Sequence, residues 1–98
     1  MEIDIRNFQG NIRNLLRKAG YHPDREQREG SLSFSRPLRG TRYPRFHIYY
    51  KKERERLSLH LDQKPSKYKH APDHGAEYQG PQIEEEVKRI RDLIQWNS

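Results

Sequence analysis

The fold prediction starts from residues 45–62, RFHIYYKKERERLSLHLD. Apolar side chains occupy every second position on both sides of a charged turn at residues 52–54: Phe46, Ile48, Tyr50, Leu57, Leu59 and Leu61. A period of two is typical of strands that bury one face, so residues 45–51 and 56–62 are expected to be strands. Because the turn between them is short, the sequence predicts an antiparallel hairpin.

One further strand and two helices are expected outside this hairpin. Residues 31–35, SLSFS, alternate in the same way and predict a short strand. Steps of three and four predict a first helix, capped by Asp4 or Asn7 and followed by Gly20: Ile5, Phe8, Ile12, Leu15, Leu16 and Ala19. Gly10 is its weak point, since glycine costs about 1 kcal/mol in a helix interior relative to alanine. The same spacing predicts a last helix from Pro81 onward: Ile83, Val87, Ile90 and Ile94.

The expected element order is therefore α-β-β-β-α, an α+β fold in a single domain of residues 1–98. Both helices have one apolar stripe to bury, so we expect them on one face of a three-stranded antiparallel sheet. Residues 21–30 are polar and are expected to be a loop. The opposite face of the sheet is expected to be open and polar: Ser31, Ser33, Ser35, Arg45, His47, Tyr49, Arg56, Ser58, His60 and Asp62.

Composition excludes several classes of protein. The chain has no cysteine, which removes disulfides, thiolate metal sites and a cysteine nucleophile. Residues 1–6 contain no apolar run, so no signal peptide is expected. No stretch approaches the apolar length of a membrane span. A cytoplasmic protein is the resulting expectation.

The positive charge is concentrated in residues 36–56, which hold eight basic and two acidic residues, enough to account for the whole net charge of +6. Such a stretch can attract phosphates. It can equally be a solvated hairpin that lysine and arginine protect from edge pairing. Together with an aromatic and cationic segment further on, it gives a candidate surface for a nucleic acid or a protein partner: Arg36, Arg39, Arg42, Arg45, His47, Tyr49, Lys51, Lys67, Tyr68 and Lys69.

A long polar connection, about residues 63–80, follows the hairpin and has little to bury. Such a loop is either functional or disordered. His60 and Asp62 lie two apart on a strand and so share a face. With His70 and His74 they could form a zinc-type site, catalytic with three ligands and water or structural with four. Alternatively, they could be an acid–base pair, or Asp62 could accept hydrogen bonds from the loop backbone, or the residues could face solvent.

Two resemblances accompany these patterns. The α-β-β-β-α order is similar to that of the double-stranded RNA-binding domain, which implies RNA contacts through residues 36–42, although Glu84-Glu85-Glu86 stands where that family has a basic cluster. The segments YPRFHIY (43–49), HLDQK (60–64) and EYQG (77–80) resemble a small uncharacterised bacterial protein family. The second resemblance implies a natural bacterial protein and carries no activity with it.

The sequence favours a small non-enzymatic binding module that contacts a nucleic acid or a protein partner through residues 36–56. The first alternative is a metal-binding or metal-dependent site, with zinc as its cofactor, built on His60, Asp62, His70 and His74. The second alternative is a homo-oligomeric interaction protein that covers its edge strand or its open sheet face with another copy.

Overall fold

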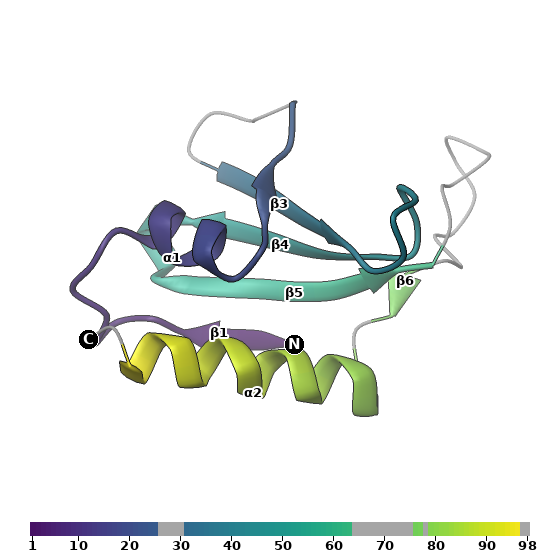
Figure 1. The fold of residues 1–98 in the computed structure, drawn as a ribbon. Helices are drawn as coiled ribbons and strands as arrows, with labels where there is room; N and C mark the ends of the chain where they lie inside the picture. The colour runs from purple at the N-terminus through teal and green to yellow at the C-terminus, as the bar shows by residue number, and fades with distance from the viewer. Residues whose placement is uncertain (26–30, 64–75, 78, 97–98) are drawn as a thin grey trace.

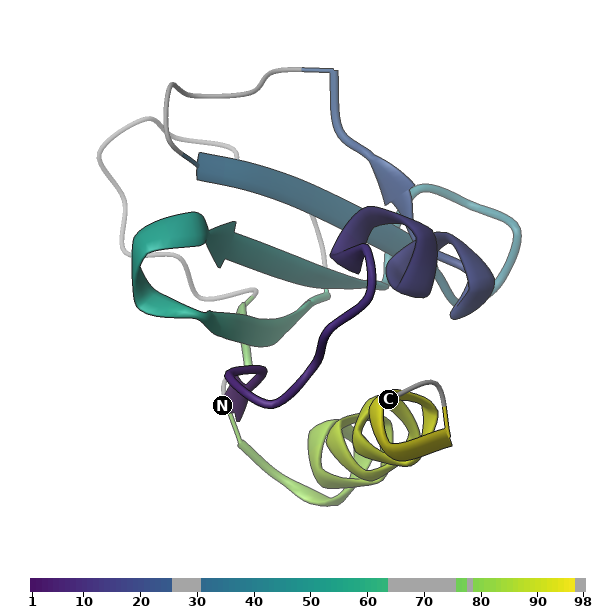
Figure 2. The same cartoon turned by 90° about the vertical axis from the view of Figure 1, so that its left-hand side faces the viewer.

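The structure is a computed structural model and describes residues 1–25, 31–63, 76–77 and 79–96 (Figures 1 and 2). Its elements follow one another along the chain in this order: β1 (Glu2–Asp4), α1 (Ile12–Lys18), β2 (His22–Pro23), β3 (Ser31–Pro37), β4 (Arg45–Lys51), a 3₁₀ helix η1 (Lys52–Arg54), β5 (Arg56–Asp62), β6 (Ala76–Glu77) and α2 (Pro81–Trp96). No helix in these ranges is long and apolar enough to span a bilayer.

The β4–β5 hairpin predicted from residues 45–62 is confirmed. Ile48 lies opposite Leu59, and Tyr50 lies opposite Leu57, so the apolar positions of both strands face the same side. The connection occupies residues 52–55, and Glu55 closes it with a positive φ of 50°. This connection places Lys51 opposite Arg56 and sets the register of every pair further along the hairpin.

The expected three-stranded sheet and the α-β-β-β-α order are wrong. Within the described residues the antiparallel strands follow the path β1-β5-β4-β3-β2, and β6 also pairs with β5. β1 pairs with β5 at residues 56–58, while β6 pairs with it at Leu61 and Asp62. The added strands are only two or three residues long, so they give too little alternation to be recognised from the sequence. The mixed α+β content of the prediction stands.

The first helix is shorter than its apolar spacing predicts. Ile3 and Ile5 are buried on either side of exposed Asp4, which is the alternation of a strand rather than of a helix. α1 begins only after Asn11, whose side-chain oxygen accepts a hydrogen bond from the backbone N–H of Asn14 at 3.1 Å. The helix thus starts just beyond Gly10, the expected weak point. Gly20 follows its end with φ +95°, the left-handed conformation expected there.

One hydrophobic core joins the apolar face of the sheet to both helices. Leu16 and Ala19 pack into it at the end of α1, while Ile83, Val87 and Ile90 do so from α2. In Figure 1, α2 runs alongside β1 and β5. The expected inward positions of the three predicted strands join this core, with Leu32 and Tyr50 only partly buried: Phe34, Phe46, Ile48, Leu57, Leu59 and Leu61.

A buried carboxylate fastens α2 to the rest of the fold. Glu86 accepts hydrogen bonds from the Tyr21 hydroxyl at 2.5 Å and from Arg36 Nε at 3.2 Å. Arg89, on the same helix, donates to Glu86 Oε1 at 2.7 Å and to the backbone carbonyl of Ala19 at 2.7 Å. These contacts connect α2 to β3 and to the segment after α1. The Arg36 side chain therefore lies on the core side of the sheet, where it pairs with Glu86, although it is cationic.

Candidate metal centre

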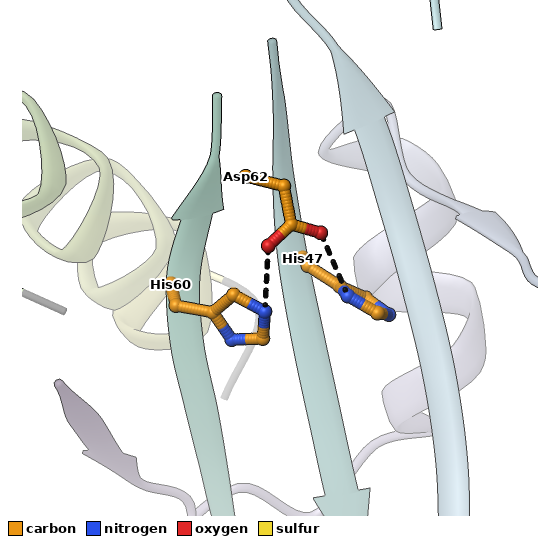
Figure 3. Close-up of side chains that lie close together, drawn as sticks. All are labelled: His47, His60 and Asp62. Carbon is orange, nitrogen blue, oxygen red and sulfur yellow. Dashed lines mark ion pairs between the residues drawn. The ribbon is translucent and has the colours of Figure 1, made fainter. Parts of the chain in front are cut away.

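A polar cluster lies on the face of the sheet opposite the core. His47 on β4 and His60 on β5 are directly opposite each other in the hairpin register. Asp62 is the last residue of β5 and points toward both rings, as Figure 3 shows. This face was expected to be open, yet His47 is only 7% exposed and His60 only 6%. The polar positions at the centre of this face are therefore buried.

One carboxylate lies between the two imidazoles. Asp62 Oδ2 is 3.3 Å from His47 Nδ1, and Asp62 Oδ1 is 3.1 Å from His60 Nε2 (Figure 3). One donor atom from each of the three side chains can be chosen so that all lie within 4.8 Å of one another. Among the described residues, this is the group whose spacing suits a shared metal ion. Arg45 Nε approaches Asp62 Oδ2 from β4 at a longer 3.4 Å.

A second carboxylate holds the far side of the His47 ring. Asp24, just after β2, places Oδ2 2.9 Å from His47 Nε2. Two serines of β3 donate to this carboxylate: Ser35 to Oδ1 at 2.7 Å, and Ser33 to Oδ2. The backbone N–H of Asp24 also donates to the Ser33 carbonyl at 2.9 Å. Asp24 is thus fixed from several directions. Together with the Ser33 hydroxyl, whose Oγ lies 2.6 Å from the same His47 Nε2, it fixes the orientation of the His47 ring.

Both carboxylates of the cluster are held ionised. Burial alone would raise the pKa of Asp62, but the hydrogen bonds from His47 and His60 outweigh it and bring this pKa well below its usual range. Burial likewise opposes the ionisation of Asp24, and the hydrogen bonds from Ser33, Ser35 and His47 leave its pKa below the ordinary value. His47 therefore lies between two negative charges. Such a position is electrostatically suited to a bound metal cation.

Aromatic contacts hold the two imidazoles in place. The ring of Tyr49 stacks on His60 with centroids 5.2 Å apart and a 20° angle between the planes. The same tyrosine lies 4.4 Å from the His47 ring, and the two imidazoles are 5.0 Å apart. Tyr49 itself is 41% exposed. It therefore forms part of the boundary between the buried cluster and solvent.

The structure brings together part of the predicted metal set and adds a member. His60 and Asp62 are adjacent, as their spacing predicts, while His70 and His74 lie outside the described residues. His47 was expected to contact a partner instead. The sequence holds the missing signal, because a hairpin turn that places Tyr50 directly opposite Leu57 also places His47 opposite His60. Asp24 has no comparable signal, since its contact depends on how β2 pairs with β3.

The expected basic surface is divided by ion pairs. Arg36 is paired with Glu86, Arg45 with Asp62, and Arg56 with Glu2. Arg39, Arg42 and Lys51 are exposed, whereas Lys67, Tyr68 and Lys69 lie outside the described residues. Arg36 and Arg45 neutralise buried or nearly buried carboxylates and are therefore less available to a phosphate backbone, whereas the Arg56–Glu2 pair is exposed. A protein partner and a homo-oligomer stay predictions.

No protein-family model, curated protein or solved structure matches this chain. The two resemblances drawn from the sequence therefore stay predictions. A function is therefore inferred from the chemistry of the His47, His60 and Asp62 cluster.

Proposed function

We propose that this chain is a metal-binding protein in which His47, His60 and Asp62 hold a divalent ion of the zinc type. The observation that carries the proposal is the convergence of two imidazoles on one carboxylate, at 3.3 and 3.1 Å. Around a tetrahedral zinc ion with bonds of about 2.0–2.1 Å, neighbouring ligand atoms lie roughly 3.4 Å apart. Three protein ligands leave one coordination position for a fourth donor.

Asp24 supports the same assignment. A histidine that binds a metal through one nitrogen commonly donates the N–H of its other nitrogen to a carboxylate, which fixes the tautomer. Asp24 Oδ2 lies 2.9 Å from His47 Nε2, so Nε2 can carry the proton and leave Nδ1 free for the ion. Ser33 and Ser35 hold Asp24 in that position. A histidine that served only as a surface residue would need none of this support.

Burial favours a bound ion over an enzymatic centre. The side chains of His47, His60 and Asp62 are nearly enclosed, and all three come from neighbouring strands rather than from a flexible cleft. A substrate would need room at the fourth coordination position, and the low exposure of these three side chains restricts access to it. The proposed ion therefore cross-links β4 and β5 at the polar face.

Isothermal titration with Zn²⁺ tests this proposal. Chelator-treated protein without a histidine tag should bind one ion per chain, while His47→Gln and His60→Gln should each weaken binding by roughly a hundredfold or more, since even supporting residues contribute about 10–100-fold. His22→Gln is the matched control, because His22 is exposed on β2 and lies outside the cluster. Circular dichroism establishes that each variant is folded.

Two outcomes would overturn the assignment. The first is the absence of stoichiometric Zn²⁺ in folded wild-type protein, which would leave a hydrogen-bonded network with no metal function. The second is an equal affinity for Zn²⁺ in the wild type, His47→Gln and His60→Gln, which would show that other residues bind the ion.

A second candidate function is electrostatic binding of a nucleic acid by the loop between β3 and β4. Arg39 and Arg42 are exposed there and form no ion pair with described residues, and Arg42 lies 5.8 Å over the Tyr43 ring. Arginines beside an aromatic ring suit phosphates and stacked bases. Arg39→Gln/Arg42→Gln should weaken binding of a labelled single-stranded oligonucleotide and reduce its salt dependence, unlike Lys88→Gln/Arg91→Gln. Equal effects of the two double variants, or binding insensitive to salt, would exclude this function.

A further inference from the structure

A cavity of about 200 Å³ lies between α1, β2 and β3, apart from the proposed ligands. Arg13 and Arg17 of α1 line it, together with Tyr21, Pro23, Asp24, Leu32 and Phe34. The cavity thus combines two guanidinium groups with a mostly apolar wall. From this combination we propose that it binds a small organic anion, with one phosphate or carboxylate group on a single ring or short apolar chain.

The two arginines provide the anion-binding part of the cavity. They lie four residues apart on a helix, so their side chains project on the same side. Both arginines are exposed, and neither guanidinium forms a hydrogen bond or an ion pair with the described residues. Like charges at this spacing repel each other. An anion between them would relieve the repulsion and could accept two charge-assisted hydrogen bonds.

The cavity's size and walls restrict the rest of the ligand. Drug-sized ligands occupy pockets of about 300–1,000 Å³, so a cavity of about 200 Å³ suits a single ring better than a whole nucleotide. Leu32, Phe34 and Pro23 offer apolar surface for that ring. The Tyr21 hydroxyl is already bonded to Glu86, which leaves the tyrosine as part of the wall rather than as a polar contact.

Asp24 orients the ligand within this cavity. It is held ionised by Ser33, Ser35 and His47 and would repel an anionic group close to it. The phosphate or carboxylate is therefore expected at the arginines, with the ring toward Leu32 and Phe34. The proposal does not depend on the metal site, because the arginines come from α1 and the proposed ligands come from β4 and β5.

Phenyl phosphate, phenylacetate and inorganic phosphate are suitable probes, titrated against ¹⁵N-labelled protein in EDTA so that the metal site has no influence. Phenyl phosphate or phenylacetate should cause saturable shifts of the backbone amides of Tyr21, Leu32 and Phe34. Whichever binds more tightly identifies the anionic group. Inorganic phosphate should bind at least roughly tenfold more weakly, because it makes no apolar contact.

Arg13→Gln/Arg17→Gln should weaken binding of the better aromatic probe at least roughly tenfold, since hydrogen bonds to charged groups contribute strongly. Arg91→Gln is the control, an exposed arginine on α2 that lies outside the cavity. The amide spectrum itself reports whether each variant is folded. The proposal is overturned if neither aromatic probe gives saturable shifts, if the shifts avoid the cavity, or if Arg91→Gln weakens binding as much as the double variant.

Discussion

The fold holds two buried or nearly buried carboxylates on opposite faces of its sheet, and they have different partners. Glu86, on the core side, accepts hydrogen bonds from Arg36, Arg89 and the Tyr21 hydroxyl. Asp62, on the polar side, lies between His47 and His60, with Arg45 at a longer distance. Both carboxyl groups have pKa values below their ordinary ones, although burial acts against ionisation in both.

The partners determine what each carboxylate can do. A guanidinium keeps its charge at any ordinary pH and cannot bind a metal, so the Glu86 cluster has one charge state near neutral pH. An imidazole can lose its proton and offer a nitrogen lone pair to an ion. Similar burial and charge thus give a fixed structural contact on one face and the proposed metal site on the other. Four predictions test this contrast.

The largest expected effect is that of Glu86→Ala. Breaking a buried ion pair typically costs 3–5 kcal/mol. Arg36 and Arg89 are 28% and 40% exposed, so water compensates in part, and we expect a loss of about 2–4 kcal/mol in the free energy of unfolding. Urea denaturation measures this loss. Glu85→Ala, which changes the exposed neighbour, is the control. An equal loss in both variants would mean that the contacts of Glu86 do not stabilise the fold.

Zinc should stabilise the protein only through the polar face. At a free concentration a hundred times the dissociation constant, an ion that binds only the folded state adds about 2.7 kcal/mol to the free energy of unfolding. This gain should appear in wild-type protein and in Tyr21→Phe, which alters the Glu86 cluster, but not in Asp62→Asn. Thermal unfolding with and without Zn²⁺ provides the measurement. If zinc stabilised Asp62→Asn as much as the wild type, Asp62 would not be a ligand of the ion.

Asp24→Asn should weaken zinc binding without abolishing it. The amide can no longer accept the His47 proton as a carboxylate does, and loss of such support typically costs 10–100-fold in metal affinity. Titration calorimetry should still find one ion per chain. Asp92→Asn, on the exposed side of α2, controls for the loss of a negative charge. An unchanged affinity in Asp24→Asn would show that the orientation of His47 does not depend on Asp24.

The smallest expected effect is the pH dependence of the Glu86 contribution. Burial would raise the pKa of Glu86, but hydrogen bonds from Arg89, Tyr21 and Arg36 leave it below the ordinary value of 4.5. Its ionised form therefore stabilises the fold above about pH 4.5, and this contribution is lost as the pH falls through the folded-state pKa. The stability difference between wild type and Glu86→Gln should shrink over that range. A difference that is constant down to pH 3 would contradict this linkage.

The same contrast shows what the sequence can predict. Alternation within residues 45–62 predicts the hairpin and the shared face of His60 and Asp62, because both depend on local periodicity. Glu86 was interpreted only as part of an acidic helix start, since nothing near it in sequence indicates Tyr21 or Arg36. β1 and Asp24 were missed for a related reason: their contacts join distant segments through very short strands.

Glu55, with its left-handed backbone, gives the proposed ligand set a particular place in the order of assembly. It closes a connection between strands that adjoin in sequence, and local pairings of this kind need little loop closure. His47, His60 and Asp62 all belong to this hairpin, whereas Asp24 arrives only when β2 pairs with β3. The pairing of β4 with β5 is therefore enough to bring the three donor groups together. A metal ion bound there would hold β4 and β5 in this register.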